Sequence, residues 1–330
     1  MLTKQLEGCR NCGYGLFVSG MQLVPSLQAM RGVMSTEDLD PHFIDLDRWT
    51  SLEAVSAMLE GQFSAIGAVQ GGANAIASAV DAAALRLGDG QGRLIYAGAG
   101  TSGRVAVQDG VELLPTYSWP WERLLLAVAG GEIALMRAVE NAEDDADAGR
   151  AFVDVSQIDA NDVVIGVAAS GKTPYTLAVL ETARRAGALT IAFANNPDTP
   201  MLHAAEHGIL LDTGSEPVCG STRMKAGTAQ KVALNMFSTA LMVRLGGVYK
   251  GLMVGMQATN AKLRVRAGKI VKALSNCDDA TAARALDVCN GNIRGAVLMA
   301  LGIDDADERA DMLARSRGNL RAALAPLLED

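Results

Sequence analysis

The fold expected of this chain is decided by the stretch Leu94-Ile-Tyr-Ala-Gly-Ala-Gly-Thr-Ser-Gly-Arg104. Its apolar start is typical of a buried strand, its glycines and hydroxyls predict a turn, and Val105-Ala-Val-Gln108 opens a helix. Glycine lets the backbone come close to a ligand, and the N-terminus of a helix favours negative charge. We therefore expect an anion, most simply a phosphate, at this turn.

Outside this stretch, apolar runs with strand character alternate with helical patterns. Further strands are expected at 124–129, 163–168, 190–193 and 209–211, and helices at 51–63, 73–87, 174–185, 201–205, 221–245, 278–289, 293–301 and 306–313. The helix that the opening loop begins is expected to end at about Leu114, and another helix is expected after the strand at 124–129, through Met136 and Val139. Short apolar strands separated by helices predict right-handed crossovers, with ligands at the carboxyl ends of the strands. The fold class is α/β, a doubly wound, mostly parallel five-stranded sheet flanked by helices, with N-terminal helices and a small C-terminal helical subdomain.

The pattern divides the chain into four segments. Residues 1–33 lack a sustained period and precede a second methionine, so we expect a disordered extension or a mis-set start codon. Residues 34–90 form an N-terminal helical segment, 91–267 the sheet domain, and 268–330 the C-terminal helical subdomain. For this subdomain we favour a packing or dimer-stabilising role.

Composition excludes several classes of protein. The 330 residues carry a formal net charge of −8, which leaves no broad basic face for nucleic acid. No window reaches the roughly 18 apolar residues of a membrane span, and Gly13 to Val24 lacks a signal-peptide cleavage site, so we expect a cytoplasmic protein without a membrane partner. Five scattered cysteines do not predict a disulfide framework, and Cys9 and Cys12 form half of a zinc site that nothing completes.

Three short motifs suggest other functions. Gly98-Ala-Gly-Thr-Ser-Gly103 matches the dinucleotide-binding fingerprint, but a dinucleotide site also needs an acidic residue at the end of its second strand. Here the nearest acidic residue, Glu122, lies before that strand. Gly166-Val-Ala-Ala-Ser-Gly-Lys-Thr173 matches a P-loop, but its strand passes through Gly166 and leaves too short a loop. His203-Ala-Ala-Glu-His207 has zinc-binding spacing, but the helix expected there is barely two turns long.

A fourth interpretation combines two loops of similar build, each of which follows a strand and opens a helix. These are Gly100 to Gly103 and Ala169 to Thr173. They offer the hydroxyls of Ser102, Ser170 and Thr173, together with backbone amides, to one phosphate. Two such loops suit a phosphorylated sugar better than a nucleotide.

Three motifs carry a resemblance to a known family. They are Ala97-Gly-Ala-Gly-Thr-Ser-Gly-Arg104, Ala168-Ala-Ser-Gly-Lys-Thr-Pro-Tyr175 and Gly220-Ser-Thr-Arg-Met-Lys-Ala-Gly-Thr-Ala-Gln-Lys231. From about Ser35 onward the chain resembles the N-acetylmuramic acid 6-phosphate etherases of the sugar isomerase (SIS) domain superfamily. The resemblance implies a homodimer with active sites near the subunit interface. It also implies cofactor-free and metal-free cleavage of the lactyl ether of a phosphorylated amino sugar.

The same resemblance assigns the site residues. The family's two acidic residues map onto Glu112 and Glu143, and we assign Glu112 as the acid at the ether oxygen and Glu143 as the base at C2, with the reverse assignment left open. Burial can separate the pKa values of two carboxyl groups so that they fill both roles. The expected substrate-binding residues are Gly100, Thr101, Ser102, Gly103, Ser170, Gly171, Lys172, Thr173, Glu216, Ser221, Thr222, Arg223 and Lys225.

The sequence departs from the family pattern beside Glu112, where Val105-Ala-Val-Gln108 and Gly110-Val-Glu-Leu-Leu114 replace the typical residues. Lys172 stands where arginine is common, which keeps the charge and loses the bidentate fork. The second hypothesis is a non-catalytic phosphosugar sensor of the glucokinase-regulatory-protein type. That regulator carries two such domains, whereas this chain is long enough for only one. The length of this chain therefore favours the enzyme.

Overall fold

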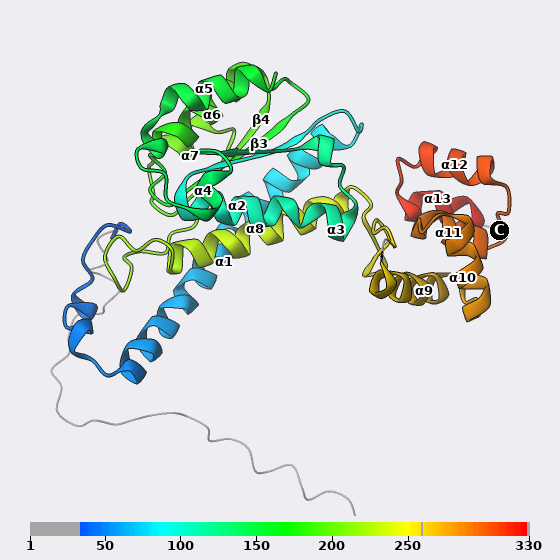
Figure 1. Cartoon of the computed structure of the whole chain (residues 1–330), viewed down its shortest axis with the longest axis horizontal. Coiled ribbons are helices and arrows are strands. Elements are labelled where there is room, and N and C mark those ends of the chain that lie inside the picture. Colours follow the sequence, from blue (N-terminus) through cyan, green and yellow to red (C-terminus); the bar gives the residue numbers. More distant parts are fainter. Residues whose placement is uncertain (1–33, 259, 329–330) are drawn as a thin grey trace, which may run out of the picture. The chain divides into compact units, whose positions relative to one another are not determined.

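The computed structural model describes residues 34–258 and 260–328, and a five-stranded parallel sheet forms its centre (Figure 1). The strand order is β2-β1-β3-β4-β5. The first strand, β1, therefore lies inside the sheet, with β2 on one side and β3, β4 and β5 on the other. The strands are β1 (Leu94–Gly98), β2 (Leu124–Val128), β3 (Val163–Ala168), β4 (Leu189–Ala194) and β5 (His207–Leu210). All paired neighbours are parallel, which confirms the doubly wound sheet expected from the sequence.

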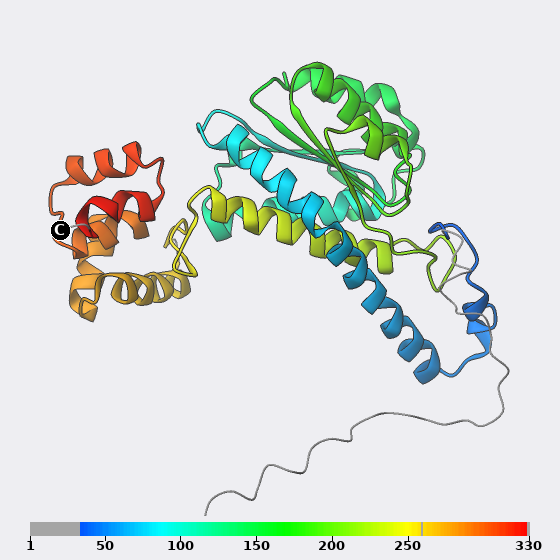
Figure 2. The ribbon, with the colours of Figure 1, turned by 180° about the vertical axis from the view of Figure 1, so that it is seen from behind.

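Helices cover both faces of the sheet (Figures 1 and 2). One face carries α1 (Ser51–Leu87), α2 (Gly100–Val111) and α8 (Lys225–Arg244), and the other carries α5 (Ala146–Val155), α6 (Pro174–Arg185) and α7 (Pro200–Ala204). Alternate strand residues serve the two layers, since Tyr96 belongs to the core with Phe237 of α8 whereas Ile95 belongs to the core with Leu180 of α6. This alternation is the period of a strand buried on both faces.

The N-terminal helices expected at 51–63 and 73–87 are one continuous helix, α1, so the predicted interruption was wrong. Thr50 begins it with a capping box that includes Glu53. Gly67, Gly71 and Gly72 lie inside this helix, where tertiary packing outweighs their low helix propensity. A side chain at Gly72 would come within 3.2 Å of the Leu210 carbonyl oxygen, so this glycine lets α1 lie close to β5.

Several other boundaries differ from the expected ones. The helix after β1 ends at Val111, and a short helix α3 (Leu113–Tyr117) follows Glu112. The helix after β2 is the single turn α4 (Ile133–Met136), and α8 begins at Lys225 rather than Ser221. His203 ends up in α7 and His207 in β5, so the two histidines do not share a helix. Short 3-10 turns complete this part: η1 (Pro41–Phe43), η2 (Leu46–Arg48), η3 (Trp121–Arg123) and η4 (Ala142–Asp144).

After α8 the chain forms a small hairpin and then helices with a core of their own. The hairpin pairs β6 (Val248–Tyr249) with β7 (Leu252–Met253). The helices are α9 (Ala261–Ser275), α10 (Asp279–Val288), α11 (Ile293–Ala300), α12 (Ala306–Arg315) and α13 (Leu320–Leu328). Of these, α10 to α12 were expected, whereas α9, α13 and the hairpin were not recognised in the sequence.

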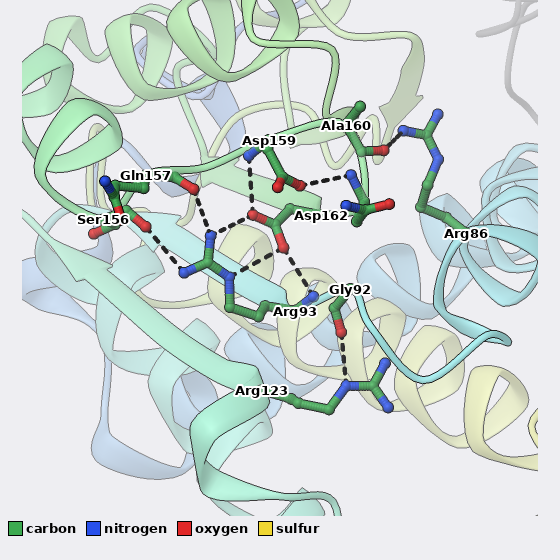
Figure 3. Close-up of polar contacts among 10 residues, drawn as sticks. Arg86, Gly92, Arg93, Arg123, Ser156, Gln157, Asp159, Ala160 and Asp162 are labelled. Atoms are coloured by element: carbon green, nitrogen blue, oxygen red, sulfur yellow. Dashed lines mark hydrogen bonds and ion pairs between the residues drawn. The ribbon is translucent and has the colours of Figure 1, made fainter.

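A partly buried ion pair connects the amino ends of β1 and β3 (Figure 3). Arg93, just before β1, donates from Nη2 to Oδ2 of Asp162 at 2.6 Å, and Asp162 lies just before β3. Because this contact fixes β1 beside β3, it also fixes the loops at their opposite, carboxyl ends. Among the residues that the structure describes, no helix has the length and apolar character needed to cross a membrane.

Candidate functional site

The two glycine and hydroxyl loops lie side by side because β1 and β3 are neighbours in the sheet. Gly98, the last residue of β1, is in register with Val167 near the end of β3. The first loop therefore opens α2 beside the point where the second opens α6. The structure brings together the two segments that were expected to bind one phosphoryl group.

Both loops present helix ends without a side-chain cap. Ala99 before α2 and Thr173 before α6 make no capping hydrogen bond, whereas Asn260, Asp278, Asn292 and Asp305 cap the helices of the C-terminal part. The first amides of a helix need acceptors, and an anion is a suitable one. The N-termini of α2 and α6 are thus available to a ligand.

The conformations of the loops are those that glycine allows. Gly100 and Gly171 have φ values of +53° and +63°, which favour glycine. In the second loop the amide of Lys172 donates to Oγ of Ser170 at 3.2 Å, and the Ser170 and Thr173 hydroxyls are 3.5 Å apart. Ser102 is almost fully buried in the first turn of α2, whereas Lys172 is exposed.

The second loop is held in place by residues that the sequence analysis missed. The side-chain amide of Asn196 donates to the Ala169 carbonyl at 3.0 Å and to the Thr36 hydroxyl at 2.9 Å, and it accepts from the Thr36 amide. The Asn195 amide also donates to the Ala169 carbonyl. Both asparagines follow β4, so polar residues after a strand were the signal that could have found them.

The third motif lies next to the first loop. A side chain at Gly227 of α8 would come within 3.6 Å of the Thr101 methyl group, so the first turn of α8 adjoins the start of α2. Ser221 and Thr222 form the turn before α8 and are half-buried, and Arg223 is exposed. The carbonyl of Thr222 accepts from the Gly227 amide at 2.8 Å.

Glu216, which was expected to contact the substrate, has a structural task in the fold. It is fully buried, and its two carboxylate oxygens accept from the backbone amides of Lys225 and Ala226 at 3.0 and 2.9 Å. A carboxylate in this position satisfies amides at the helix end and complements its positive dipole. Glu216 therefore caps the N-terminus of α8, whereas the N-termini of α2 and α6 have no side-chain cap.

Lys225 is also buried, and its surroundings are acidic. Burial lowers its pKa below the usual lysine value, while the charges of Glu216, Asp40 and Asp212 act in the opposite direction. A side chain at Gly61 of α1 would lie 3.3 Å from Cδ of Lys225, so α1 passes close to the lysine stem. The positive charge of Lys225 thus offsets part of the negative charge of these three carboxylates.

The two glutamates expected to carry the chemistry are carried by different elements, Glu143 by η4 and Glu112 by the end of α2. Glu143 belongs to η4, which packs against α6, and the neighbouring Asp145 is close enough to Tyr175 to contribute to its raised pKa. Glu112 follows α2 directly, and a helix of 12 residues spans about 18 Å. Glu112 is therefore about one helix length away from Gly100, where α2 begins, and Glu143 lies on a segment that packs against α6.

Two family models match the chain. The model described as glucokinase regulatory protein N-terminal SIS domain matches residues 74–184, and the SIS domain model matches residues 134–240. Together they span the sheet and the helices that carry the loops.

Curated relatives match over most of the chain. It is 48% identical to an N-acetylmuramic acid 6-phosphate etherase of Deinococcus radiodurans, over 88% of this chain and 94% of that protein. Proteins of the same name from Streptomyces coelicolor and Serratia proteamaculans are 42% and 44% identical. These alignments cover 92% and 89% of this chain and 97% and 98% of the relatives.

Proposed function

The chain belongs to the N-acetylmuramic acid 6-phosphate etherase family, and from this we propose that it is a lyase acting on that phosphorylated amino sugar in cell-wall recycling. It cleaves the D-lactyl ether and gives N-acetylglucosamine 6-phosphate and D-lactate. The observation that supports the substrate class is the pair of uncapped helix N-termini, α2 and α6, at the carboxyl ends of adjacent strands. They would bind the 6-phosphoryl group without a cofactor or a metal.

The reaction needs a base and an acid. In the ring-opened sugar the C1 aldehyde acidifies the proton on C2, so a carboxylate removes that proton and the C3–O bond breaks. A carboxylic acid protonates the departing lactate oxygen, and water then adds to C3 of the unsaturated intermediate. We assign the base to Glu143, whose segment packs against α6, and the acid to Glu112.

The length of α2 leads us to propose that the site is shared between two copies of the chain. A hexose 6-phosphate held at Gly100 is shorter than the roughly 18 Å to Glu112 of the same chain. Both glutamates are exposed in the single chain, so a second copy has access to them. In this arrangement Glu143 acts on the sugar held by its own loops, and Glu112 is supplied by the partner.

An apolar stripe on α1 supports the homodimer. Leu52, Val55, Leu59, Phe63 and Ile66 recur at helical spacing and are 49–76% exposed. Such a stripe is the usual mark of a helix face that packs against another surface. A symmetric dimer would cover the same stripe on both copies.

Because the proposed substrate is a phosphorylated sugar, we propose that the enzyme works in the cytoplasm.

Activity is tested with N-acetylmuramic acid 6-phosphate in heavy-oxygen water. We expect release of lactate and incorporation of the label at C3 of the sugar. Binding of the sugar phosphate without lactate would instead support the sensor hypothesis, although the match to full-length etherases over most of this single-domain chain favours the enzyme.

The shared site is tested by mixing two inactive variants, Glu112→Gln and Glu143→Gln, after dissociation and reassembly. A hybrid dimer then contains one site with Glu143 from one copy and Glu112 from the other, so random mixing restores about one quarter of the wild-type activity. If both glutamates came from the same chain, every site in the hybrid would lack one of them and the mixture would stay inactive.

A further inference from the structure

A second cleft lies at the other end of the sheet from the phosphate loops. Its volume is about 480 Å³, within the range of small-molecule sites. Leu87 to Gly90, before β1, and Arg123, before β2, line one side of it. The rest of the lining comes from Tyr117 to Pro120, Met242, Leu245, Gly247, Arg294, Ala314 and Arg317. None of these residues belongs to the expected substrate site.

The charge of this cleft is positive in a chain whose net charge is negative. Three arginines line it, Arg123, Arg294 and Arg317, and Asp89 is the carboxylate among the lining residues. The cleft therefore carries an excess of two positive charges, which favours an anion. Arginine also presents a planar fork that matches the oxygens of a phosphoryl group.

Arg123 is held rigidly at one side of the cleft (Figure 3). Its Nε donates to the Gly92 carbonyl at 2.7 Å and its Nη2 to the Leu87 carbonyl at 3.2 Å. The guanidinium also lies over the ring of Trp119, 4.3 Å from the centroid. A side chain fixed in this way loses little conformational entropy when it binds a ligand.

Arg294 is a half-buried side chain whose hydrogen-bond donors are not all used within the described part of the chain. Its Nη2 donates to the Gly246 carbonyl at 3.2 Å, but its Nε is buried and has no hydrogen-bond partner in the part of the chain that the structure describes. A buried polar atom without a partner costs free energy, so an acceptor beside it would be stabilising. Burial also lowers the pKa of Arg294 from its ordinary value, and a bound anion would oppose this effect.

We propose that this cleft is a second anion site, which binds the phosphoryl group of a small phosphorylated metabolite between Arg123, Arg294 and Arg317. The site is separate from the substrate loops and does not depend on the etherase activity. Tyr117 and Ser118 connect it with the chemistry, because they end α3, which begins directly after Glu112. A ligand in the cleft would therefore fix the segment that carries Glu112.

Pyrophosphate is a suitable probe, and the substrate loops must be disabled first. We expect Ser102→Ala/Ser170→Ala protein to bind pyrophosphate in isothermal titration calorimetry at low salt. Adding Arg317→Met should weaken this binding by about tenfold or more, because the guanidinium contributes a charge-assisted contact. Since Arg317 is exposed, this variant should fold normally, and Arg294→Met provides a second test at the half-buried arginine.

Arg315→Met is the matched control. Arg315 is the last residue of α12, two residues before Arg317, and its side chain is 83% exposed. Unlike Arg317, it does not line the cleft. It should change the affinity by less than about twofold, the effect of one distant, screened charge. The proposal is overturned if the loop-disabled protein does not bind pyrophosphate, or if Arg317→Met and Arg315→Met bind it equally well. Lactate release by the wild-type protein is measured in parallel, so that failure of the etherase assignment is seen separately.

Discussion

The hydroxyl of Tyr96 in β1 donates a hydrogen bond to Oδ2 of Asp109 in α2 at 2.8 Å, and both residues are buried. Asn235 and Ser238 of α8 donate to the other carboxylate oxygen. Burial, followed by the charge of Asp109 and this hydrogen bond, raises the pKa of Tyr96 well above its ordinary value. One carboxylate thus joins the central strand to two helices, one turn before Glu112.

Replacing Asp109 with alanine should destabilise the protein strongly. Two buried donors, on Tyr96 and Ser238, and the half-buried amide of Asn235 would lose their acceptor, and we expect the free energy of unfolding to fall by about 3 kcal/mol. Urea denaturation followed by circular dichroism measures the change. Asp147→Ala is the control, because the Asp147 side chain is 91% exposed and should cost less than about 1 kcal/mol. Equal effects of the two substitutions would contradict the role given to Asp109.

Glu216→Gln should weaken the start of α8. The glutamine amide nitrogen cannot accept a hydrogen bond, so one of the two backbone amides loses its partner and the helix end loses a negative charge. We expect a loss of about 1–2 kcal/mol in unfolding free energy. Glu181→Gln, an exposed change on α6, should leave stability unchanged. An unchanged denaturation midpoint for Glu216→Gln would argue against the cap.

Tyr175 gives a prediction about alkaline pH. Burial, together with the charge of Asp145, raises its pKa to about 12 from 10.0. Above pH 10 the unfolded chain loses this proton while the folded chain keeps it, so this stabilising contribution is complete below pH 10 and is lost between pH 10 and 12. Stability measured across that range should fall less steeply in Tyr175→Phe than in the wild type. Identical slopes would show that Tyr175 does not titrate differently in the two states.

Gly171→Ala should abolish binding of the sugar phosphate. Its φ of +63° is unfavourable for alanine, and the new methyl group would collide with the Thr199 side chain. Gly251→Ala is the matched control, since Gly251 has a φ of +76° but open space around it. It should lose about 1 kcal/mol of stability from backbone strain and retain binding. Calorimetry with glucosamine 6-phosphate compares the two, and normal binding by Gly171→Ala would contradict the proposed loop geometry.

Charges on the apolar stripe of α1 should dissociate the dimer. Phe63 is 72% exposed in the single chain, so Phe63→Asp should leave the folded chain intact and disfavour a buried apolar interface. Analytical ultracentrifugation should then show monomers, and lactate release should be lost with the shared site. Leu85→Asp is the control, because Leu85 is 86% exposed on the same helix but outside the stripe. A dimeric Phe63→Asp protein would mean that the stripe is not the interface.

Local sequence patterns predicted the sheet well, since each strand is a short apolar run bounded by turn residues. The β3 and α6 boundaries agree with the structure, and Pro174 marks the first helical residue as expected. The division of α1 was wrong because glycines inside a helix lower only its local propensity, and Gly72 serves the packing on β5. Helix α5 was also missed, although Phe152 and Val153 give it an apolar face that packs on the core around Leu180.

What the sequence determined by itself was the set of parts: parallel strands, two loops that open helices, and the motifs that mark the family. These follow from hydrophobic period and turn chemistry, which act between near neighbours in the chain. The tertiary structure decided that Glu216 caps α8, that Asn196 holds the second loop, and that η4 with Glu143 packs against α6. Such relationships depend on where distant segments of the chain meet, and local sequence patterns do not encode those meeting points.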